Sequence, residues 1–227
     1  MADFRTHFTT ACTVSGIFAT TALYTGEITL IDTVLIWGTG TFGGLLPDID
    51  SDNSITLTIT STLLAAIIAI GLGGYLASRV PLAHNLALIT AVLWFFRGAV
   101  IPFFARITVH RGNWHSLSAA FLFAFCITNC SYHFFEKTAS FSFLLGLNGG
   151  IGFITHLFLD EIFAINLASL KLKRSFGTAL KLWDFSSPCL STLLLALCAV
   201  QIYYLPGFQP LESIISKLLE TTKMGLG

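Results

Sequence analysis

The chain has 227 residues, of which 54% are hydrophobic and 11% are charged, and its formal net charge at pH 7 is zero. Soluble domains carry about a quarter charged residues, so this composition argues against a water-soluble fold and predicts a membrane protein. Because the charge balance provides no basic surface, we expect no nucleic-acid partner. The five cysteines lie in or beside apolar runs without metal-type spacing, and we interpret them as free buried thiols.

Apolar runs recur along the whole chain. A transmembrane helix needs about 20 largely apolar residues to cross the hydrocarbon core of a bilayer. Runs that approach this length are Phe8–Tyr24, Leu30–Leu46, Ile55–Ala77, Leu82–Phe104, Trp114–Phe134, Phe141–Phe163 and Pro188–Tyr204. The sequence therefore predicts an all-α, polytopic membrane bundle of about seven transmembrane helices. We expect a single domain over residues 1–227.

The segment Leu211–Lys223 follows the last run and differs from it in pattern. Its apolar residues stand at helical spacing with polar residues between them, which predicts a short amphipathic helix at the membrane interface.

Basic residues in the loops predict the orientation of the bundle. With seven crossings, the side of the N-terminus collects most of them: Arg5, Arg106, Arg111, Lys171, Lys173, Arg174 and Lys181. Cytoplasmic loops carry an excess of lysine and arginine, so we expect the N-terminus in the cytoplasm. The same topology brings the candidate metal ligands to one membrane face: His7, Asp48, Asp50, His110, His115, His156 and Asp160.

An acidic turn follows the second run. Pro47 disfavours helix at the residue before it and so separates the run from Asp48 and Asp50. Two carboxylates at this spacing in an irregular turn can coordinate a cation. The alternative is a solvated acidic loop.

The segment His110-Arg111-Gly112-Asn113-Trp114-His115-Ser116 concentrates polar residues in a largely apolar chain. His110 and His115 are five apart and do not share a helix face, but Gly112 allows a turn that brings them together. Arg111 suits bidentate binding of phosphate or carboxylate, and it serves equally well as a topology anchor.

His156 and Asp160 are four apart in the sixth run. They share one face of the expected helix and can reach one ion. Their neighbours are apolar, and ionisable residues at membrane depth by default mark a functional site. The alternative is a His–Asp hydrogen bond that ties helices together.

Taken in order, these motifs resemble the YdjM-like family. The resemblance rests on His7, Leu46-Pro47-Asp48-Ile49-Asp50, His110-Arg111-Gly112-x-x-His115-Ser116 and His156-x-x-x-Asp160, and it covers roughly residues 5 to 185. Members are bacterial inner-membrane proteins regarded as metal-dependent hydrolases, distantly similar to zinc phospholipase C and P1 nuclease. The resemblance implies helical phosphoesterase chemistry and a set of metal ligands: His7, Asp48, His110, His115, His156 and Asp160, with Asp50 close behind.

The chain departs from the family pattern at two places. Trp114 stands where family members commonly have a threonine, and its bulk would reshape the pocket or close its mouth. The segment after Asp160 lacks a proline-containing turn. The soluble zinc enzymes also have more ligands than this chain offers, so we expect one or two ions rather than three.

These observations predict a hydrolase that uses zinc or a similar divalent ion to cleave a phosphoester. The substrate would be a lipid or another phosphorylated small molecule delivered from the membrane, whose lipids are the expected partners. Asp50 or Glu161 could act as general base, and Arg111 could neutralise charge on the phosphoryl oxygens. Two alternatives remain open: a transporter, channel or partner-binding subunit with a structural metal site, and a proton or cation pathway.

Overall fold

The computed structural model describes residues 3–50, 54–100, 114–166, 171–172, 177 and 180–225. These residues are α-helical apart from turns, short 3₁₀ and π segments and one two-residue ladder. The chain divides into two compact units, one made of Met1–Pro47 with Asn113–Gly227 and the other of Asp48–Gly112. The expectation of a single domain stays a prediction.

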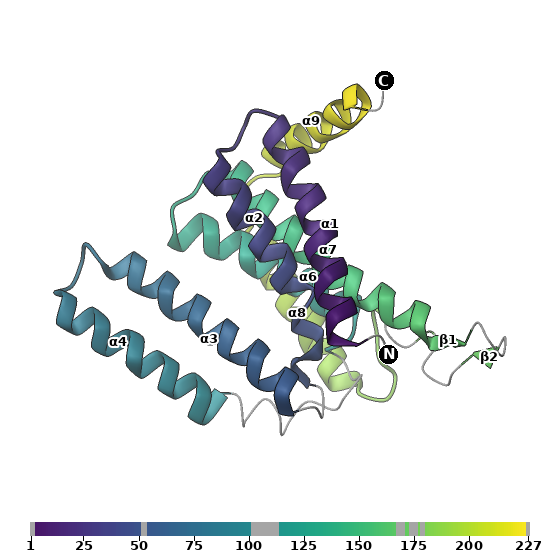
Figure 1. Ribbon diagram of the computed structural model, residues 1–227, viewed down its shortest axis with the longest axis horizontal. Helices are drawn as coiled ribbons and strands as arrows, with labels where there is room; N and C mark the ends of the chain where they lie inside the picture. The colour runs from purple at the N-terminus through teal and green to yellow at the C-terminus, as the bar shows by residue number, and fades with distance from the viewer. Residues whose placement is uncertain are drawn as a thin grey trace. The chain divides into compact units, whose positions relative to one another are not determined.

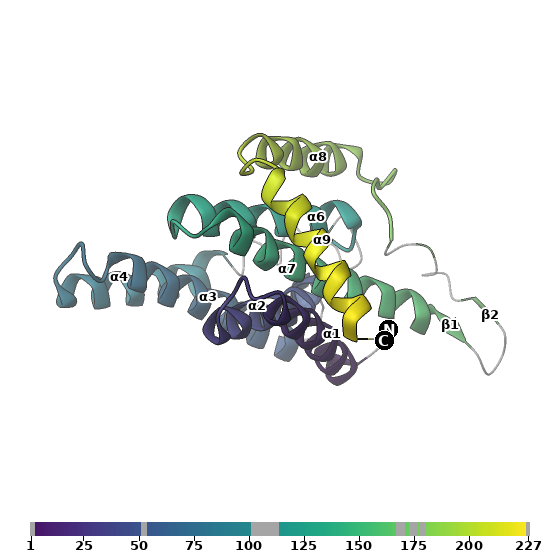
Figure 2. The same cartoon turned by 90° about the horizontal axis from the view of Figure 1, so that it is seen from above.

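In the first unit, α7 is the longest helix and packs most extensively against α1, α2 and α6 (Figure 1). The helix α8 packs on α6, and α9 packs on α7 and α1 (Figure 2). The helices of this unit are α1 Phe4–Tyr24, α2 Leu30–Gly43, α6 Leu117–Asn129, α7 Ala139–Ala164, α8 Pro188–Tyr203 and α9 Gln209–Gly225.

Shorter segments follow three of these helices. The 3₁₀ turn η1, Leu46–Asp50, follows α2, and the π-helical turn η3, Cys130–Phe134, continues α6. Strands β1, Ile165–Asn166, and β2, Lys171–Leu172, pair antiparallel after α7.

Glycines allow α2 and α7 to approach closely. A Cβ atom on Gly152 would overlap with the carbonyl oxygen of Gly40, and one on Gly43 would overlap with that of Gly149. Small residues at such positions let membrane helices pack backbone against backbone. This close contact brings the end of α2 beside the middle of α7, where part of the candidate site lies.

Asn148 ties three helices together in the centre of the first unit. Its side chain is fully buried, and its Nδ2 donates to the carbonyl oxygens of Ile36 at 2.7 Å and Ser15 at 3.4 Å. Interhelical hydrogen bonds of this kind stabilise membrane helix packing by about 1 kcal/mol. The register of α1, α2 and α7 is therefore fixed by side-chain chemistry as well as by shape.

The second unit contains α3, Ser54–Leu76, and α4, Leu82–Phe95, which is continued by a π-helical turn η2, Phe96–Val100. The two helices pack against each other. The buried Asn85 donates to the carbonyl oxygen of Gly73 at 2.8 Å and so links them.

Each apolar run expected to be helical contains a helix, and the expected C-terminal amphipathic helix is α9. The all-helical class is confirmed. Three described helices are long and apolar enough to cross a membrane, namely Leu82–Ala99, Leu117–Phe134 and Ala139–Ala164. Helix α2 has only 14 residues and α8 only 16, fewer than the roughly 20 that a membrane crossing needs. The number of crossings, about seven, therefore stays a prediction.

Candidate metal centre

His7 enters the site from the first turns of α1. Asp3 caps this helix, because its carboxylate accepts the backbone N–H of Thr6 at 2.8 Å. The cap fixes where the helix begins, and the side chain of His7 four residues later is 1% exposed. An imidazole close to the chain terminus is thus held inside the protein.

His156 and Asp160 enter from α7, and each is 1% exposed. The Nδ1 atom of His156 lies 2.8 Å from the carbonyl oxygen of Gly44, which requires Nδ1 to carry the hydrogen. The lone pair therefore lies on Nε2, which is 3.9 Å from Oδ2 of Asp160. Histidines that bind metals commonly donate their other ring N–H to a carbonyl or carboxylate in this way.

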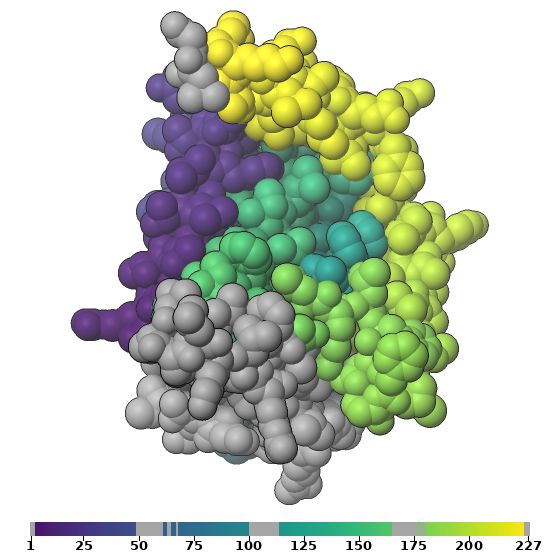
Figure 3. All heavy atoms as spheres, turned by 90° about the vertical axis from the view of Figure 1, so that its right-hand side faces the viewer, coloured from purple at the N-terminus to yellow at the C-terminus, as the bar shows by residue number. Residues whose placement is uncertain are grey.

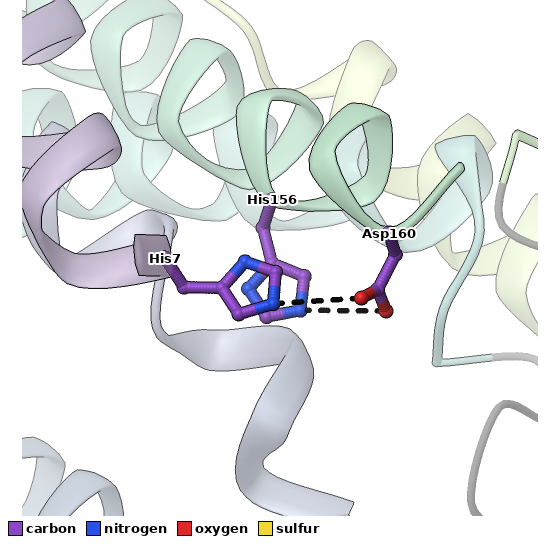
Figure 4. A group of neighbouring side chains, drawn as sticks. All are labelled: His7, His156 and Asp160. Carbon is purple, nitrogen blue, oxygen red and sulfur yellow. Dashed lines mark ion pairs between the residues drawn. The ribbon is translucent and has the colours of Figure 1, made fainter. Parts of the chain in front are cut away.

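His7 meets both of these residues (Figure 4). Its ring stacks on His156 with centroids 3.7 Å apart and planes 13° apart, and its Nε2 lies 3.4 Å from Oδ1 of Asp160. Neither ring nitrogen of His7 has a hydrogen-bond partner among the residues that the structure describes. A buried polar group without such a partner is costly, and a bound ion would satisfy it.

His115 completes the cluster from the start of α6 and is fully buried. Its Nε2 lies 4.0 Å from Oδ2 of Asp160. The next residue, Ser116, caps α6 by accepting the N–H of Ala119 at 3.2 Å. The N–H of Leu117 is held by the carbonyl oxygen of Lys181 at 2.9 Å, so the start of this helix is anchored from a distant segment.

Three members of this cluster could hold a divalent metal ion together. His7, His156 and Asp160 offer ligand atoms that all lie within 4.8 Å of one another. Zinc bound to nitrogen and oxygen at about 2.0–2.2 Å in a tetrahedron places its ligands roughly 3.3–3.6 Å apart. The separation of 3.4 Å between His7 and Asp160 matches this value, and that of 3.9 Å between His156 and Asp160 needs a small adjustment.

The structure places the other expected ligands only in part. His110 and Arg111 lie outside the described residues. Asp48, the first residue of the second unit, is 7% exposed. Asp50 ends the turn η1, and its side chain is outside the described part of the chain. The ligand roles of these residues stay predictions.

Glu161, an expected general base, is buried, and its carboxylate already accepts a hydrogen bond. Its Oε2 accepts the backbone N–H of Gly177 at 2.6 Å. Gly177 has a φ of 79°, a left-handed conformation that favours glycine. This contact ties a later segment to the end of α7, while the role of Glu161 as a base stays a prediction.

Two residues beside the cluster have roles that metal-ligand patterns in the sequence do not indicate. Trp114 donates its Nε1–H to the carbonyl oxygen of Leu46 at 3.1 Å, and its ring packs edge-on against Phe153. Gly44 supplies the carbonyl oxygen for His156. The departure from the family pattern at Trp114 singled out that position, whereas no side-chain pattern could identify a backbone carbonyl.

Apolar helices around a buried His/Asp cluster define a helical membrane protein with a candidate metal centre. The chain belongs to the YdjM inner membrane protein family, whose family model matches residues 1–170. The match includes His7, His115, His156 and Asp160 and ends before α8. The family name and the apolar helices support a location in the inner membrane.

No curated protein and no solved structure matches the chain. The distant similarity to zinc phospholipase C and P1 nuclease therefore stays a prediction.

Proposed function

We propose that this protein is a membrane-bound, metal-dependent hydrolase whose site is formed by His7, His115, His156 and Asp160. One observation carries the proposal: three imidazoles and a carboxylate, each no more than 1% exposed, converge within an apolar helical unit. Burying such groups together costs free energy that a bound cation offsets. Ionisable residues at membrane depth are rare outside functional sites.

We propose zinc or a similar divalent ion, because imidazole and carboxylate ligands suit it. Oδ1 of Asp160 faces His7, and Oδ2 lies nearer His115 and His156. A carboxylate used on both oxygens can serve one ion or bridge two. Further ligands from Asp48, Asp50 and His110 are part of the proposal.

The proposed reaction is hydrolysis of a phosphoester. A divalent ion at such a site polarises a phosphoryl oxygen and lowers the pKa of water. The chain's own residues hold the donor set in place: Gly44 fixes the ring of His156, and the cap at Ser116 fixes the start of α6 beside His115. We propose Arg111 for neutralising phosphoryl charge and Asp50 or Glu161 as general base.

A structural metal site in a transporter, channel or partner-binding subunit is the second candidate. The near-complete burial of the four side chains favours it, because structural zinc sites are closed whereas catalytic ones keep an open position.

Metal content and hydrolysis of purified protein separate these functions. We expect wild-type protein in nanodiscs to hold about one or two zinc ions and to cleave phosphoesters in a chelator-sensitive manner. Asp160→Asn preserves shape but removes the charge, so we expect at least about a tenfold loss of zinc affinity and of activity. Glu220→Gln, which changes an exposed carboxylate of α9 outside the cluster, is the control and should keep both. Zinc bound without any phosphoester cleavage would favour the structural site, and wild-type protein without metal would overturn both functions.

A further inference from the structure

An apolar groove runs between α1 and α7 in the first unit. Its volume is about 450 Å³, and its walls include Thr10 and Val14 of α1 and Ile154, Phe158 and Ile162 of α7. Figure 3 shows the face on which α7, in green, reaches the surface beside α1, in purple. A cavity of this volume is within the range of roughly 300–1,000 Å³ that is typical of small-molecule sites.

The groove is lined mainly by apolar side chains, which suits a hydrocarbon occupant. None of its lining residues is charged. The hydroxyl group of Thr155 in its wall donates to the carbonyl oxygen of Ile151 at 2.8 Å, so it is satisfied within its own helix. Phe158 and Ile162 are 55% and 41% exposed, and they lie on a helix long and apolar enough to cross a membrane. The groove therefore opens toward the bilayer.

The groove is lined by α1 and α7, two of the helices that carry residues of the metal centre. His7, Thr10 and Val14 stand at positions i, i+3 and i+7, on one face of α1. On α7, the lining residues Thr155 and Leu159 directly precede His156 and Asp160. Both walls of the groove thus come from the helices that supply ligands, at the same depth along α7.

We propose that this groove holds the hydrocarbon chain of the substrate, so that the site acts on a lipid rather than on a water-soluble phosphoester. The inference rests on the proposed hydrolase function. A soluble phosphoester would find no charged partner in the groove and mostly apolar side chains, whereas a lipid chain entering from the bilayer exchanges one apolar environment for another. The occupant is one acyl or isoprenoid chain, with its phosphoester end toward His7.

Photocrosslinking tests the groove without any need for turnover. Wild-type protein in nanodiscs receives a phospholipid with a diazirine in its acyl chain, and labelled peptides are mapped by mass spectrometry. Val14→Trp fills the groove, and Leu193→Trp places the same side chain at an exposed position of α8. We expect labels concentrated on α1 and α7 and reduced at least fivefold in Val14→Trp but not in Leu193→Trp.

Labels spread evenly over the lipid-facing helices, or labelling of Val14→Trp equal to wild type, would overturn the proposal. Retained zinc shows that a variant is folded. Ile154→Trp tests the same groove from α7 if Val14→Trp loses its metal.

Hydrolysis of two substrates separates this inference from the function on which it rests. The pair shares a headgroup and carries either long acyl chains or short ones that leave it water-soluble. We expect the long-chain ester to be preferred at least tenfold in kcat/KM, with the preference lost in Val14→Trp. Equal cleavage of both esters would refute the proposed role of the groove and leave the proposed hydrolase function standing. If neither ester is cleaved, the hydrolase fails and the inference about its substrate fails with it, while crosslinking still decides whether the groove binds a lipid chain.

Discussion

At the scale of single residues, the side chain of Trp114 holds the segment before α6 against the segment that follows α2. Its indole N–H donates to the carbonyl oxygen of Leu46, one residue before the proline that ends the second run. Because His115 follows directly, the position of that imidazole depends on this contact. The tryptophan therefore supports the position of His115. A threonine at the same position is shorter and could not reach the carbonyl oxygen of Leu46 in the same way.

We expect Trp114→Phe to lower stability by about 1 kcal/mol, because the carbonyl oxygen of Leu46 loses its donor while most of the ring packing remains. Thermal unfolding in detergent measures this change, and zinc affinity should weaken a few-fold in parallel. Trp94→Phe on α4 is a matched control, since its side chain is 82% exposed. Equal effects of the two substitutions would contradict a role for Trp114 in holding the site.

Asp184 gives a pH dependence at the segment that anchors the start of α6. The Lys181 ammonium, which lies 2.7 Å from its carboxylate, and the hydroxyl and N–H of Ser186 lower the pKa of Asp184 from 3.8 to about 2. A carboxyl whose folded-state pKa is lowered stabilises the fold above its unfolded-state pKa. That contribution disappears as the pH falls toward the folded-state value.

We therefore expect Asp184→Asn to lower stability at pH 7 by about 1 kcal/mol, a value reduced for solvent screening. The difference from wild type should shrink between about pH 4 and pH 2. Thermal midpoints measured across this range test it. A difference that stays constant down to pH 2 would show that the charge of Asp184 is not responsible.

At the residue scale, sequence spacing correctly predicted which side chains share a helix face. The spacing of His156 and Asp160 places them on one face, and the structure has them there. His7 is far away in sequence, and only the expected topology and the family resemblance linked it to them. The carbonyl oxygen of Gly44 could not be predicted, because backbone groups carry no side-chain pattern.

At the scale of elements, the contact of α2 with α7 sets the geometry of the site. Gly44 follows α2 and holds His156, while Gly152 lies one turn before His156 on α7. A methyl group on Gly152 would meet the backbone of Gly40, which cannot rotate away as a flexible side chain could. The two helices would have to separate, and the carbonyl oxygen of Gly44 would move with α2.

We expect Gly152→Ala to destabilise the protein by about 1–3 kcal/mol through overpacking and to reduce zinc binding. Gly38→Ala on α2 is the matched control, because nothing lies within 4 Å of its added Cβ. That control should be neutral or slightly stabilising, since alanine favours helix by up to about 1 kcal/mol over glycine. Unfolding and zinc titration of both variants measure the effects, and a Gly152→Ala protein that binds zinc like wild type would contradict this account.

The helices themselves were predictable because long apolar runs leave few alternatives for a membrane chain. Helix α7 extends only slightly beyond the expected Phe141–Phe163. The π-helical turns η2 and η3 were not predicted, because a local change in hydrogen-bond register leaves the apolar composition unchanged. The run Leu30–Leu46 ends early as a helix, at Gly43, because glycines favour a break before Pro47.

At the scale of the whole molecule, α6 and α7 fix which end of the bundle carries the site. They are consecutive helices that are each long and apolar enough to cross a membrane, and they pack together. Residues 135–138 join them at one end. His115 before α6 and Asp160 near the end of α7 therefore lie at the opposite end, together with His7.

The basic residues predict that this end faces the cytoplasm, and cysteine labelling can test the orientation. In a background without the five native cysteines, Arg5→Cys and Lys137→Cys report the two ends from exposed positions. An impermeant maleimide should label Lys137→Cys in intact spheroplasts and Arg5→Cys only in inverted vesicles, because lysine and arginine accumulate on the cytoplasmic side. The reverse pattern would invert the orientation and leave the geometry of the site unchanged. Labelling of both positions from the same side would contradict the crossing itself, because His7 and Asp160 meet at the end of α7 that is farthest from Lys137.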